Sequence, residues 1–162
     1  MVQGLLCVTL APLALVLALQ DRPLRAVAEY RIPVVVGCGL DLIDIARFER
    51  EVSRHGDGLL TEVFTDIERQ RAAALPRPAC GHAGAFAVKE ACLKALGTGL
   101  IGRMSWRDIT VMTDHLHPPR VTLVGETARV AAEQGVERIH AALAFTRDKA
   151  IAWIVLWRAH GV

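Results

Sequence analysis

The stretch Ala85–Leu100, AFAVKEACLKALGTGL, places three charged side chains within an alanine-rich apolar segment. Its apolar residues recur at helical spacing, which predicts a helix from about His82 to Leu96 with one face in the protein core. Gly97 follows at the position where a left-handed C-cap is favoured. The helix therefore ends in a glycine-rich turn, where a ligand can approach the backbone closely.

Glu90 and Lys94 are four residues apart, so their side chains project from neighbouring turns of this helix. The simplest interpretation is a solvated ion pair that stabilises the helix by about 0.2–0.5 kcal/mol. Three features favour a binding site instead: the small apolar neighbours, the second lysine at Lys89, and the glycine-rich turn. A carboxylate can hold Mg²⁺, and an adjacent ammonium can neutralise phosphate oxygens. The pattern thus indicates a site for a metal-bound phosphate.

A second carboxylate follows a glycine-rich segment earlier in the chain. Val34–Val36 is predicted to be a buried strand that enters a tight turn at Gly37–Gly39, and Asp41 comes directly after. Since Mg²⁺ on a phosphorylated substrate usually takes one or two carboxylates, Asp41 is a candidate ligand. It is equally well placed to cap a helix that begins near Leu42, and Asp44 lies close enough to share that role.

The remaining pattern predicts an α+β domain with a mostly antiparallel sheet packed by helices. A capping box at Thr65–Glu68 begins a helix that prolines end after about Leu75. A turn at Thr146–Lys149 joins the last two strands into a hairpin. The other predicted helices are 43–52 and 125–134, and the other predicted strands are 108–112, 120–124, 138–145 and 150–157.

The composition excludes some classes of function. The net charge of +2 arises from 19 basic and 17 acidic residues, which is too balanced for a dedicated nucleic-acid-binding protein. The four cysteines contain no CxxC pair, so the sequence predicts neither a zinc site nor a disulfide framework. A reducing cytoplasm is the simplest compartment.

The first 32 residues are predicted to be an apolar extension that precedes a single domain at 33–162. The run Gly4–Leu19 lacks a preceding Lys or Arg, is interrupted by Pro12, and is shorter than the ~20 residues of a membrane span. We therefore expect no stable membrane association and a non-essential segment, as an upstream start codon would produce. A weak signal peptide or anchor is the alternative.

Two motifs resemble those of a known family. GCGLDLIDIARFER (Gly37–Arg50) is similar to the opening motif of the holo-acyl-carrier-protein synthases, which are small single-domain 4′-phosphopantetheinyl transferases. FAVKEACLKALGTG (Phe86–Gly99) is similar to their second and more specific motif. The spacing of the motifs, FTDIE from Phe64, and the final paired strands also fit. The resemblance covers about Val34 to Leu156.

The resemblance implies an enzyme that transfers the 4′-phosphopantetheine group of coenzyme A to a serine of an apo acyl carrier protein, of fatty-acid or polyketide type. The reaction would depend on Mg²⁺ and release 3′,5′-ADP, and the enzyme would be a homotrimer with active sites at its subunit interfaces. Glu90 or a metal-bound water would accept the serine proton.

The same resemblance assigns roles to individual residues. Asp41 and Glu90 would be the Mg²⁺ ligands, and Lys94 would contact the coenzyme A diphosphate and assist proton transfer. The nucleotide region would be lined by Lys89 and by Gly97, Thr98 and Gly99. Arg47, on the first helix, would engage the acidic carrier protein.

The chain departs from the family pattern at two places near the coenzyme. Ala85 replaces an arginine, and Ala144-Phe145 replaces a Ser-His pair. His82, Arg77 or Arg147 would then have to supply the missing polar groups. Ala144-Phe145 slightly favours the alternative that the chain is a non-catalytic trimeric homologue that binds coenzyme A or a carrier protein. The intact set Asp41, Glu90 and Lys94 argues against that alternative, so we expect activity.

Overall fold

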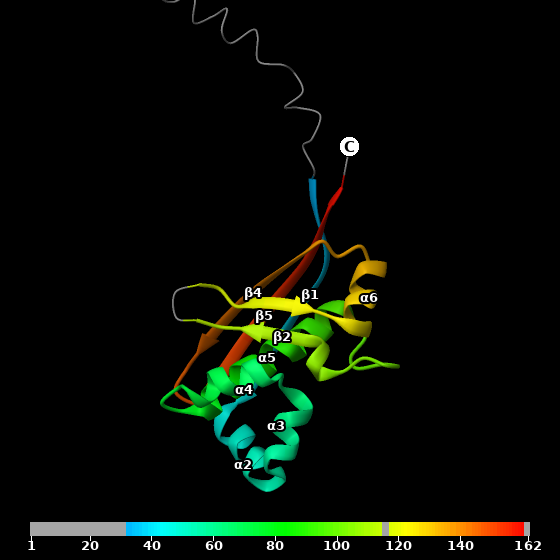
Figure 1. The fold of residues 1–162 in the computed structure, drawn as a ribbon. Helices are drawn as coiled ribbons and strands as arrows, with labels where there is room; N and C mark the ends of the chain where they lie inside the picture. The colour runs from blue at the N-terminus through cyan, green and yellow to red at the C-terminus, as the bar shows by residue number, and fades with distance from the viewer. Residues whose placement is uncertain (1–31, 115–116, 161–162) are drawn as a thin grey trace, which may run out of the picture. The chain divides into compact units, whose positions relative to one another are not determined.

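A long first strand, a central helix and a final hairpin organise the part of the chain that can be described, residues 32–114 and 117–160 of a computed structural model. Of the predicted extension 1–32, all but Ile32 lies outside the described residues. The elements, labelled in Figure 1, are β1 (Ile32–Asp44), α2 (Ile45–His55), α3 (Asp57–Val63), α4 (Asp66–Ala73), α5 (Pro78–Leu96), the 3₁₀ turn η2 (Trp106–Asp108), β2 (Ile109–Met112), β3 (Arg120–Leu123), α6 (Gly125–Glu133), β4 (Arg138–Phe145) and β5 (Lys149–His160).

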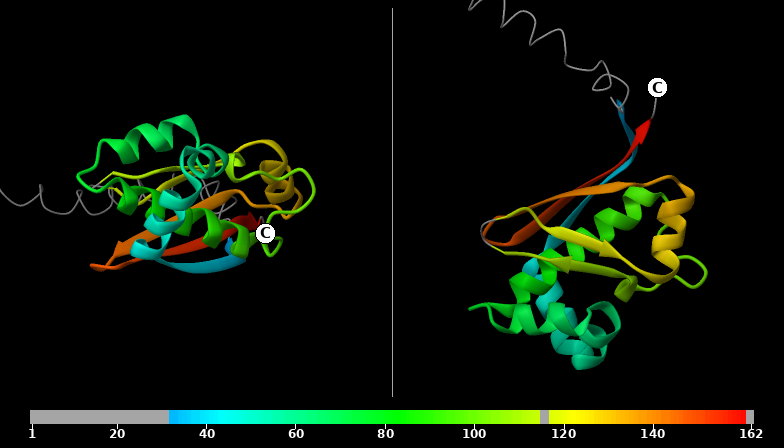
Figure 2. Two further views of the ribbon diagram at one scale, coloured as in Figure 1. Left: turned by 90° about the horizontal axis from the view of Figure 1, so that it is seen from below. Right: turned by 45° about the horizontal axis from the view of Figure 1, so that its top comes forward.

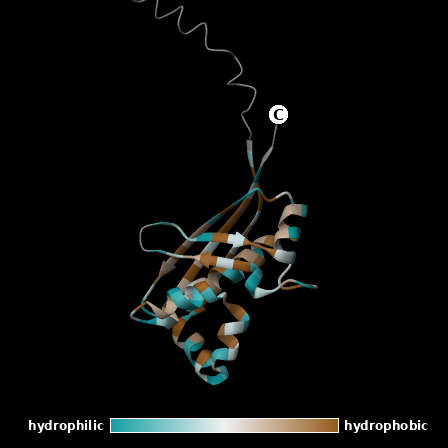
Figure 3. Ribbon diagram, in the orientation of Figure 1, coloured by the Kyte–Doolittle hydropathy of each residue, from teal (hydrophilic) through white to brown (hydrophobic). Residues whose placement is uncertain are grey.

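The strands form two sheets. One has the order β1-β5-β4, and the other pairs β2 with β3 in antiparallel register. β4 and β5 form the predicted hairpin, in which Ala142 lies opposite Trp153. Figure 2 shows β1 and β5 side by side, and the hydrophobic colour runs along β5 in Figure 3. The prediction of an α+β fold with antiparallel strands and packed helices is confirmed.

Helix α5 is the centre of the packing. It contacts α2 and α4 as well as strands β2 and β4, and Figure 1 shows it between the strands and the group α2–α4. Small side chains make this close packing possible, and Ala83, Ala87 and Ala91 are fully buried. The prediction of a helix with a core face ending at Leu96 is confirmed, although the helix begins one turn earlier, with Pro78 in its first turn.

Gly37 and Gly39 lie inside β1, so the predicted tight turn at this position is wrong. Neither glycine has a positive φ. Instead, both allow the strand backbone to touch α5 directly: a Cβ atom on Gly39 would lie 2.0 Å from the Ala91 carbonyl oxygen, and one on Gly37 would lie 2.1 Å from the Ala95 carbonyl oxygen. The glycines therefore set the distance between β1 and α5.

We expect Gly39→Ala to destabilise the protein by about 1–3 kcal/mol, because the added methyl group must push β1 away from the α5 backbone. The measurement is urea unfolding followed by circular dichroism. Gly58→Ala is the matched control, since a Cβ atom there would meet nothing within 4 Å. Equal midpoints for the two variants would contradict the proposed backbone contact.

Helix α3 was not predicted. It follows Gly56, which has a φ of 66°, and Val63 is its only buried residue. A seven-residue helix with one buried side chain carries little periodic signal in the sequence. Its role is local, since its carboxyl end supplies a carbonyl group to the core, as described below.

Candidate active site

Strand β1 directs Asp41 toward α5. Side chains two residues apart point to the same face of a strand, so Asp41 shares the α5-facing side of Gly37 and Gly39. Its exposed fraction is 9 %, whereas those of Leu40 and Leu42 are 59 % and 51 %. The carboxylate is therefore held against the helix that carries the charged residues of the second motif.

Asp44, and not Asp41, caps the following helix. The Asp44 Oδ1 atom accepts a hydrogen bond from the Arg47 backbone N–H at 2.8 Å, and α2 begins at Ile45. This removes the capping role that the sequence left open for Asp41. The Asp41 side chain is buried because it lies on the α5-facing side of β1, not because it caps a helix.

Lys94 joins Asp41 at the last turns of α5. The Lys94 Nζ atom donates a hydrogen bond to Asp41 Oδ1 at 2.5 Å, and half of the Lys94 side chain is exposed. The other carboxylate oxygen, Asp41 Oδ2, is buried and has no hydrogen-bond partner among the described residues. One oxygen of Asp41 is thus paired with an ammonium, while the other is unsatisfied.

Glu90 completes the group of charges. Burial raises the pKa of its carboxyl above the usual value, the negative charge of Asp41 raises it further, and Lys94 opposes both effects. The hydrogen bond from Lys94 to Asp41 in turn raises the pKa of the Lys94 ammonium. The three predicted residues Asp41, Glu90 and Lys94 therefore lie together, as two mutually repelling carboxylates and one cation.

The structure places Lys89 elsewhere. Its ammonium is fully buried and donates to a Glu68 carboxylate oxygen at 3.0 Å. It also donates to the carbonyl oxygens of Val63 at 3.0 Å, Trp106 at 3.0 Å and Ile109 at 2.5 Å. The prediction that Lys89 lines the nucleotide region is therefore wrong, because its donors are enclosed and used inside the protein.

The turn after α5 is exposed and lies directly beyond Lys94. Gly97 is the left-handed C-cap, with a φ of 70°, and its N–H donates to the Lys94 carbonyl at 3.1 Å. Gly99 also has a positive φ, of 63°, and a Cβ atom on either glycine would meet nothing within 4 Å. The backbone of Gly97, Thr98 and Gly99 is thus open to a ligand, and contact with a nucleotide stays a prediction.

Arg47 borders a cavity that the sequence analysis missed. The cavity has a volume of about 630 Å³ and lies between α2, α3 and α5. Its apolar wall includes Phe86 and Trp106. Its charged rim is mixed, with Arg47, Lys149, Asp44, Glu51 and Glu62. Phe86 precedes Glu90 by four residues, so Glu90 lies one turn of α5 beyond the cavity wall, although it does not line the cavity. The four-residue spacing of Phe86 and Glu90 was the one feature of the sequence from which an apolar surface beside the carboxylate could have been predicted.

A second cavity lies where the chain departs from the family pattern. It has a volume of about 500 Å³, and Arg77, Leu143 and Phe145 are among the residues that line it. Phe145 is half-exposed and packs against Gly84, where a Cβ atom would lie 2.7 Å from its ring. The Phe145 ring therefore packs against the amino-terminal half of α5.

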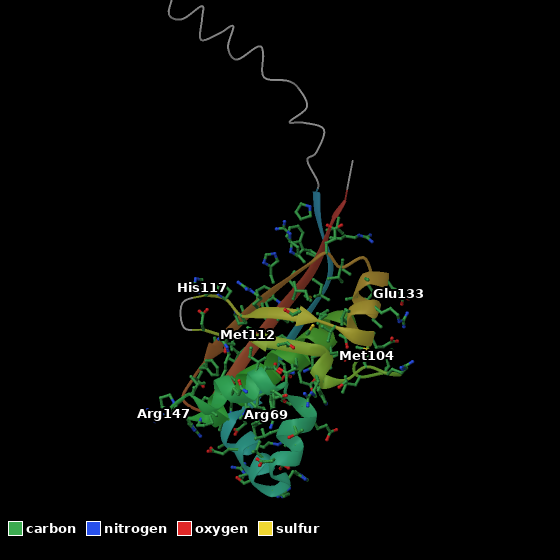
Figure 4. All side chains as sticks on the ribbon, in the orientation of Figure 1. Arg69, Met104, Met112, His117, Glu133 and Arg147 are labelled. Atoms are coloured by element: carbon green, nitrogen blue, oxygen red, sulfur yellow. The ribbon has the colours of Figure 1, made fainter. Side chains whose placement is uncertain are left out.

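Of the three residues named as substitutes for the missing polar groups, only Arg77 lines this cavity. His82 is 7 % exposed and packs on the Phe64 ring at 5.0 Å between centroids, and burial lowers its pKa. Arg147 lies at the turn between β4 and β5, labelled in Figure 4. His82 is too buried to offer its side chain to a ligand.

Two negative findings apply to the described residues. No group of three or more His, Cys, Asp or Glu side chains there is arranged to hold a metal ion. None of the described helices combines the length and apolar character needed to cross a membrane.

Comparison with known proteins identifies the class to which this fold belongs, which is a class of transferases. Residues 37–153 match the ACPS family model, described as the 4′-phosphopantetheinyl transferase superfamily. The holo-[acyl-carrier-protein] synthase of Geotalea daltonii is 39 % identical over 123 residues, which cover 76 % of this chain and 98 % of that protein. That of Vibrio cholerae is 34 % identical over 125 residues, covering 77 % and 99 %.

Solved structures agree. The holo-[acyl-carrier-protein] synthase of Neisseria meningitidis superposes with a TM-score of 0.70 and 28 % identity, covering 76 % of this chain and 98 % of that one. A Bacillus anthracis synthase in complex with coenzyme A gives a TM-score of 0.62 and 30 % identity, covering 76 % and 97 %. The chain belongs to the holo-[acyl-carrier-protein] synthase family of the 4′-phosphopantetheinyl transferase superfamily.

Proposed function

We propose that this protein transfers the 4′-phosphopantetheine group from coenzyme A to a serine of an apo acyl carrier protein, of fatty-acid or polyketide type, with release of 3′,5′-ADP. The observation that carries the proposal is the convergence of Asp41, Glu90 and Lys94 at one end of α5. These are the charge types that phosphoryl transfer needs, since the protein must position the reactants and offset charge on the phosphoryl oxygens.

The two carboxylates fit a Mg²⁺ ion. Asp41 Oδ2 is buried without a hydrogen-bond partner among the described residues, and a divalent cation would satisfy it. Asp41 also raises the pKa of Glu90, a repulsion that a shared cation would relieve. When bound, Mg²⁺ would neutralise charge on the diphosphate of coenzyme A. Asp41 and Glu90 are thus the proposed metal ligands.

The other residues act on the substrates directly. Lys94 is exposed enough for its ammonium to contact the diphosphate, and the turn of Gly97, Thr98 and Gly99 offers open backbone for the nucleotide. Glu90, or a metal-bound water, is the proposed acceptor of the serine proton. The serine oxygen then attacks the β-phosphorus, and 3′,5′-ADP leaves.

Arg47 and the cavity beside it are the proposed docking site for the carrier protein. The rim carries charges of both signs, and the Arg47 guanidinium is the group on it that suits an acidic partner. The apolar wall formed by Phe86 and Trp106 suits an apolar side chain of that partner. Because Phe86 is one turn from Glu90, a protein bound there would present its serine near the carboxylates.

We expect Arg47→Glu to raise the KM for the carrier protein about ten-fold or more, which corresponds to about 1.4 kcal/mol, with a smaller change in kcat. Steady-state assays with varied carrier protein measure this. Arg50→Glu, on the same helix but not on the cavity, is the matched control. Equal KM values for the two variants would exclude Arg47 as a specific contact.

The outer face of the sheet supports the proposal of a homotrimer. Alternating side chains of β1 and β5 leave Leu40, Leu42 and Trp153 between 51 % and 59 % exposed on the face opposite α5. Exposed apolar residues gathered on one sheet face mark a protein contact, and other copies of the chain are the proposed occupants. The proposal that active sites lie at the subunit interfaces rests on the family resemblance alone.

Trp153→Arg should convert the assembly to monomers and lower the transfer rate in parallel, because a charge at the centre of an apolar interface is costly to bury. Light scattering after gel filtration measures the mass. Ile67→Arg is the control, since Ile67 is also exposed, at 46 %, but lies on α4. A Trp153 variant that keeps the mass of the unmodified protein would refute this interface.

The compartment is proposed to be cytoplasmic. The described cysteines, Cys38, Cys80 and Cys92, form no disulfide, and Cys38 is exposed. An exposed free thiol is stable in a reducing environment.

The deciding experiment is intact-protein mass spectrometry of an apo acyl carrier protein incubated with this protein, coenzyme A and Mg²⁺. A mass gain of one phosphopantetheine group that is absent with EDTA supports the transferase. Phe145 lines the second cavity where the family pattern has part of a Ser-His pair, and this departure favours a second candidate, a homologue that binds coenzyme A without chemistry. No gain on either type of carrier, from a protein that still binds coenzyme A, would establish that candidate.

A further inference from the structure

The Lys94 ammonium is hydrogen-bonded to Asp41, one of the two carboxylates proposed as metal ligands. We propose that Lys94 stands in for the divalent cation on Asp41 in the metal-free protein, and that the incoming cation displaces it toward the substrate phosphates. This inference rests on the proposed function of the site. It adds that Lys94 has two positions, and that metal binding selects between them.

The contacts of Lys94 suit an exchangeable group. In the described residues its ammonium makes a single hydrogen bond, to Asp41 Oδ1, and half of its side chain faces solvent. Lys89, five residues earlier on α5, makes four such bonds and is fully buried. Lys89 is therefore fixed by its surroundings, whereas Lys94 loses only one hydrogen bond when it moves.

The charges explain the direction of the exchange. Asp41 and Glu90 carry two negative charges when ionised, and Lys94 balances only one of them. A divalent cation balances both. It also repels an ammonium at the same carboxylate, because two cations a few ångströms apart interact strongly away from bulk water. Metal binding therefore makes the position on Asp41 unfavourable for Lys94 and frees its charge for an anion.

Displacement of Lys94 by the cation couples the binding of the cation to the binding of phosphate groups. A cation that frees Lys94 increases the affinity of the site for phosphate groups, and by linkage a bound phosphate group increases the affinity for the cation. We expect Lys94→Met to bind Mg²⁺ more tightly than the unmodified protein does in the absence of coenzyme, since no ammonium competes for Asp41. Isothermal titration calorimetry with Mg²⁺ alone measures this.

Removing a positive charge would tighten cation binding even without exchange, so the position of Lys94 must be followed directly. The probe is acetylation by an activated ester, quantified for each lysine by peptide mass spectrometry, with Mg²⁺ alone or with NaCl at equal ionic strength. A free amine reacts faster than one held in an ion pair. Mg²⁺ should raise the rate at Lys94 about three-fold or more.

Two controls accompany the measurement. Lys149 is also ion-paired, to Asp44, so its rate reports general screening and should not change with Mg²⁺. In Asp41→Asn, Lys94 has lost its charged partner, so its rate should already be high without the metal and should not respond to it. A Lys94 rate in the unmodified protein that stays constant or falls as Mg²⁺ is added, with or without detectable Mg²⁺ binding, overturns the exchange.

Failure of the exchange and failure of the proposed transferase activity give different results. Phosphopantetheine transfer with a constant Lys94 rate would leave the transferase intact and exclude the exchange. A Mg²⁺-dependent rise at Lys94 without transfer to any carrier protein would establish the exchange and exclude the transferase.

Discussion

Glu90→Gln is expected to lower the rate of phosphopantetheine transfer by about 10²–10³-fold or more, a loss comparable to removing a group that stabilises transition-state charge. The amide has nearly the shape of the carboxylate, but it is a poor Mg²⁺ ligand and cannot accept the serine proton. The measurement is the initial rate of carrier modification by mass spectrometry. Glu137→Gln, at an exposed glutamate, is the matched control.

The same variant should stabilise the metal-free protein, by an amount that depends on pH. The pKa of Glu90 is raised above its ordinary value of 4.5, mainly by burial and then by Asp41. The folded protein therefore holds this proton more tightly than the unfolded chain does. As pH rises from below 4.5 through the raised pKa, ionisation of Glu90 lowers the free energy of unfolding by an increasing amount.

Glu90→Gln should consequently have a higher thermal midpoint than the unmodified protein at neutral pH, and the difference should vanish below pH 4.5. Thermal unfolding in EDTA at several pH values tests this. Normal turnover by Glu90→Gln would remove Glu90 from the ligand list. A lower midpoint at neutral pH would show that the carboxylate has a structural role instead.

Lys89→Met is expected to destabilise the protein by about 3–5 kcal/mol, because it leaves Glu68 buried without its cation. Lys89 and Glu68 form an ion pair in which the side chains are 0 % and 1 % exposed. Glu68 also accepts hydrogen bonds from Thr65 and from the Val111 backbone N–H. The change therefore disturbs α4, β2 and α5 together, and the thermal midpoint should fall by about 10 °C.

Lys94→Met is the matched control on the same helix. Its ion pair with Asp41 is half-exposed on the lysine side, so its loss should cost less than about 1 kcal/mol. Lys89→Met/Glu68→Gln should recover part of the stability that Lys89→Met loses, since it removes the uncompensated charge. Equal losses for Lys89→Met and Lys94→Met in denaturant unfolding would refute the different roles assigned to these lysines.

The sequence predicted the elements with strong local patterns. Helix α5 and its Gly97 cap, and the two strands of the last hairpin, follow from residue spacing over one continuous segment. The motifs also selected Asp41, Glu90 and Lys94, which the structure brings together. The short helix α3 was missed, because one buried residue in two turns leaves no periodic pattern.

Long-range packing decided what the sequence left open or indicated wrongly. Gly37 and Gly39 are consistent with a turn when only neighbouring residues are considered, but the α5 backbone lying against β1 keeps them extended. Asp41 and Asp44 were both candidate caps. The start of α2 at Ile45 assigned that role to Asp44 and left Asp41 facing α5.

The clearest case is the pair of lysines on α5. Lys89 and Lys94 are the same residue type in the same motif, and the sequence assigned both to the coenzyme. Five residues on a helix correspond to a rotation of about 140°, so the two side chains leave α5 on different sides. The packing of α3, α4 and β2 against one side encloses Lys89, whereas β1 brings only Asp41 to Lys94. The sequence by itself determined that this helix carries the charges, and only the tertiary structure decided which charge is structural and which is open to a ligand.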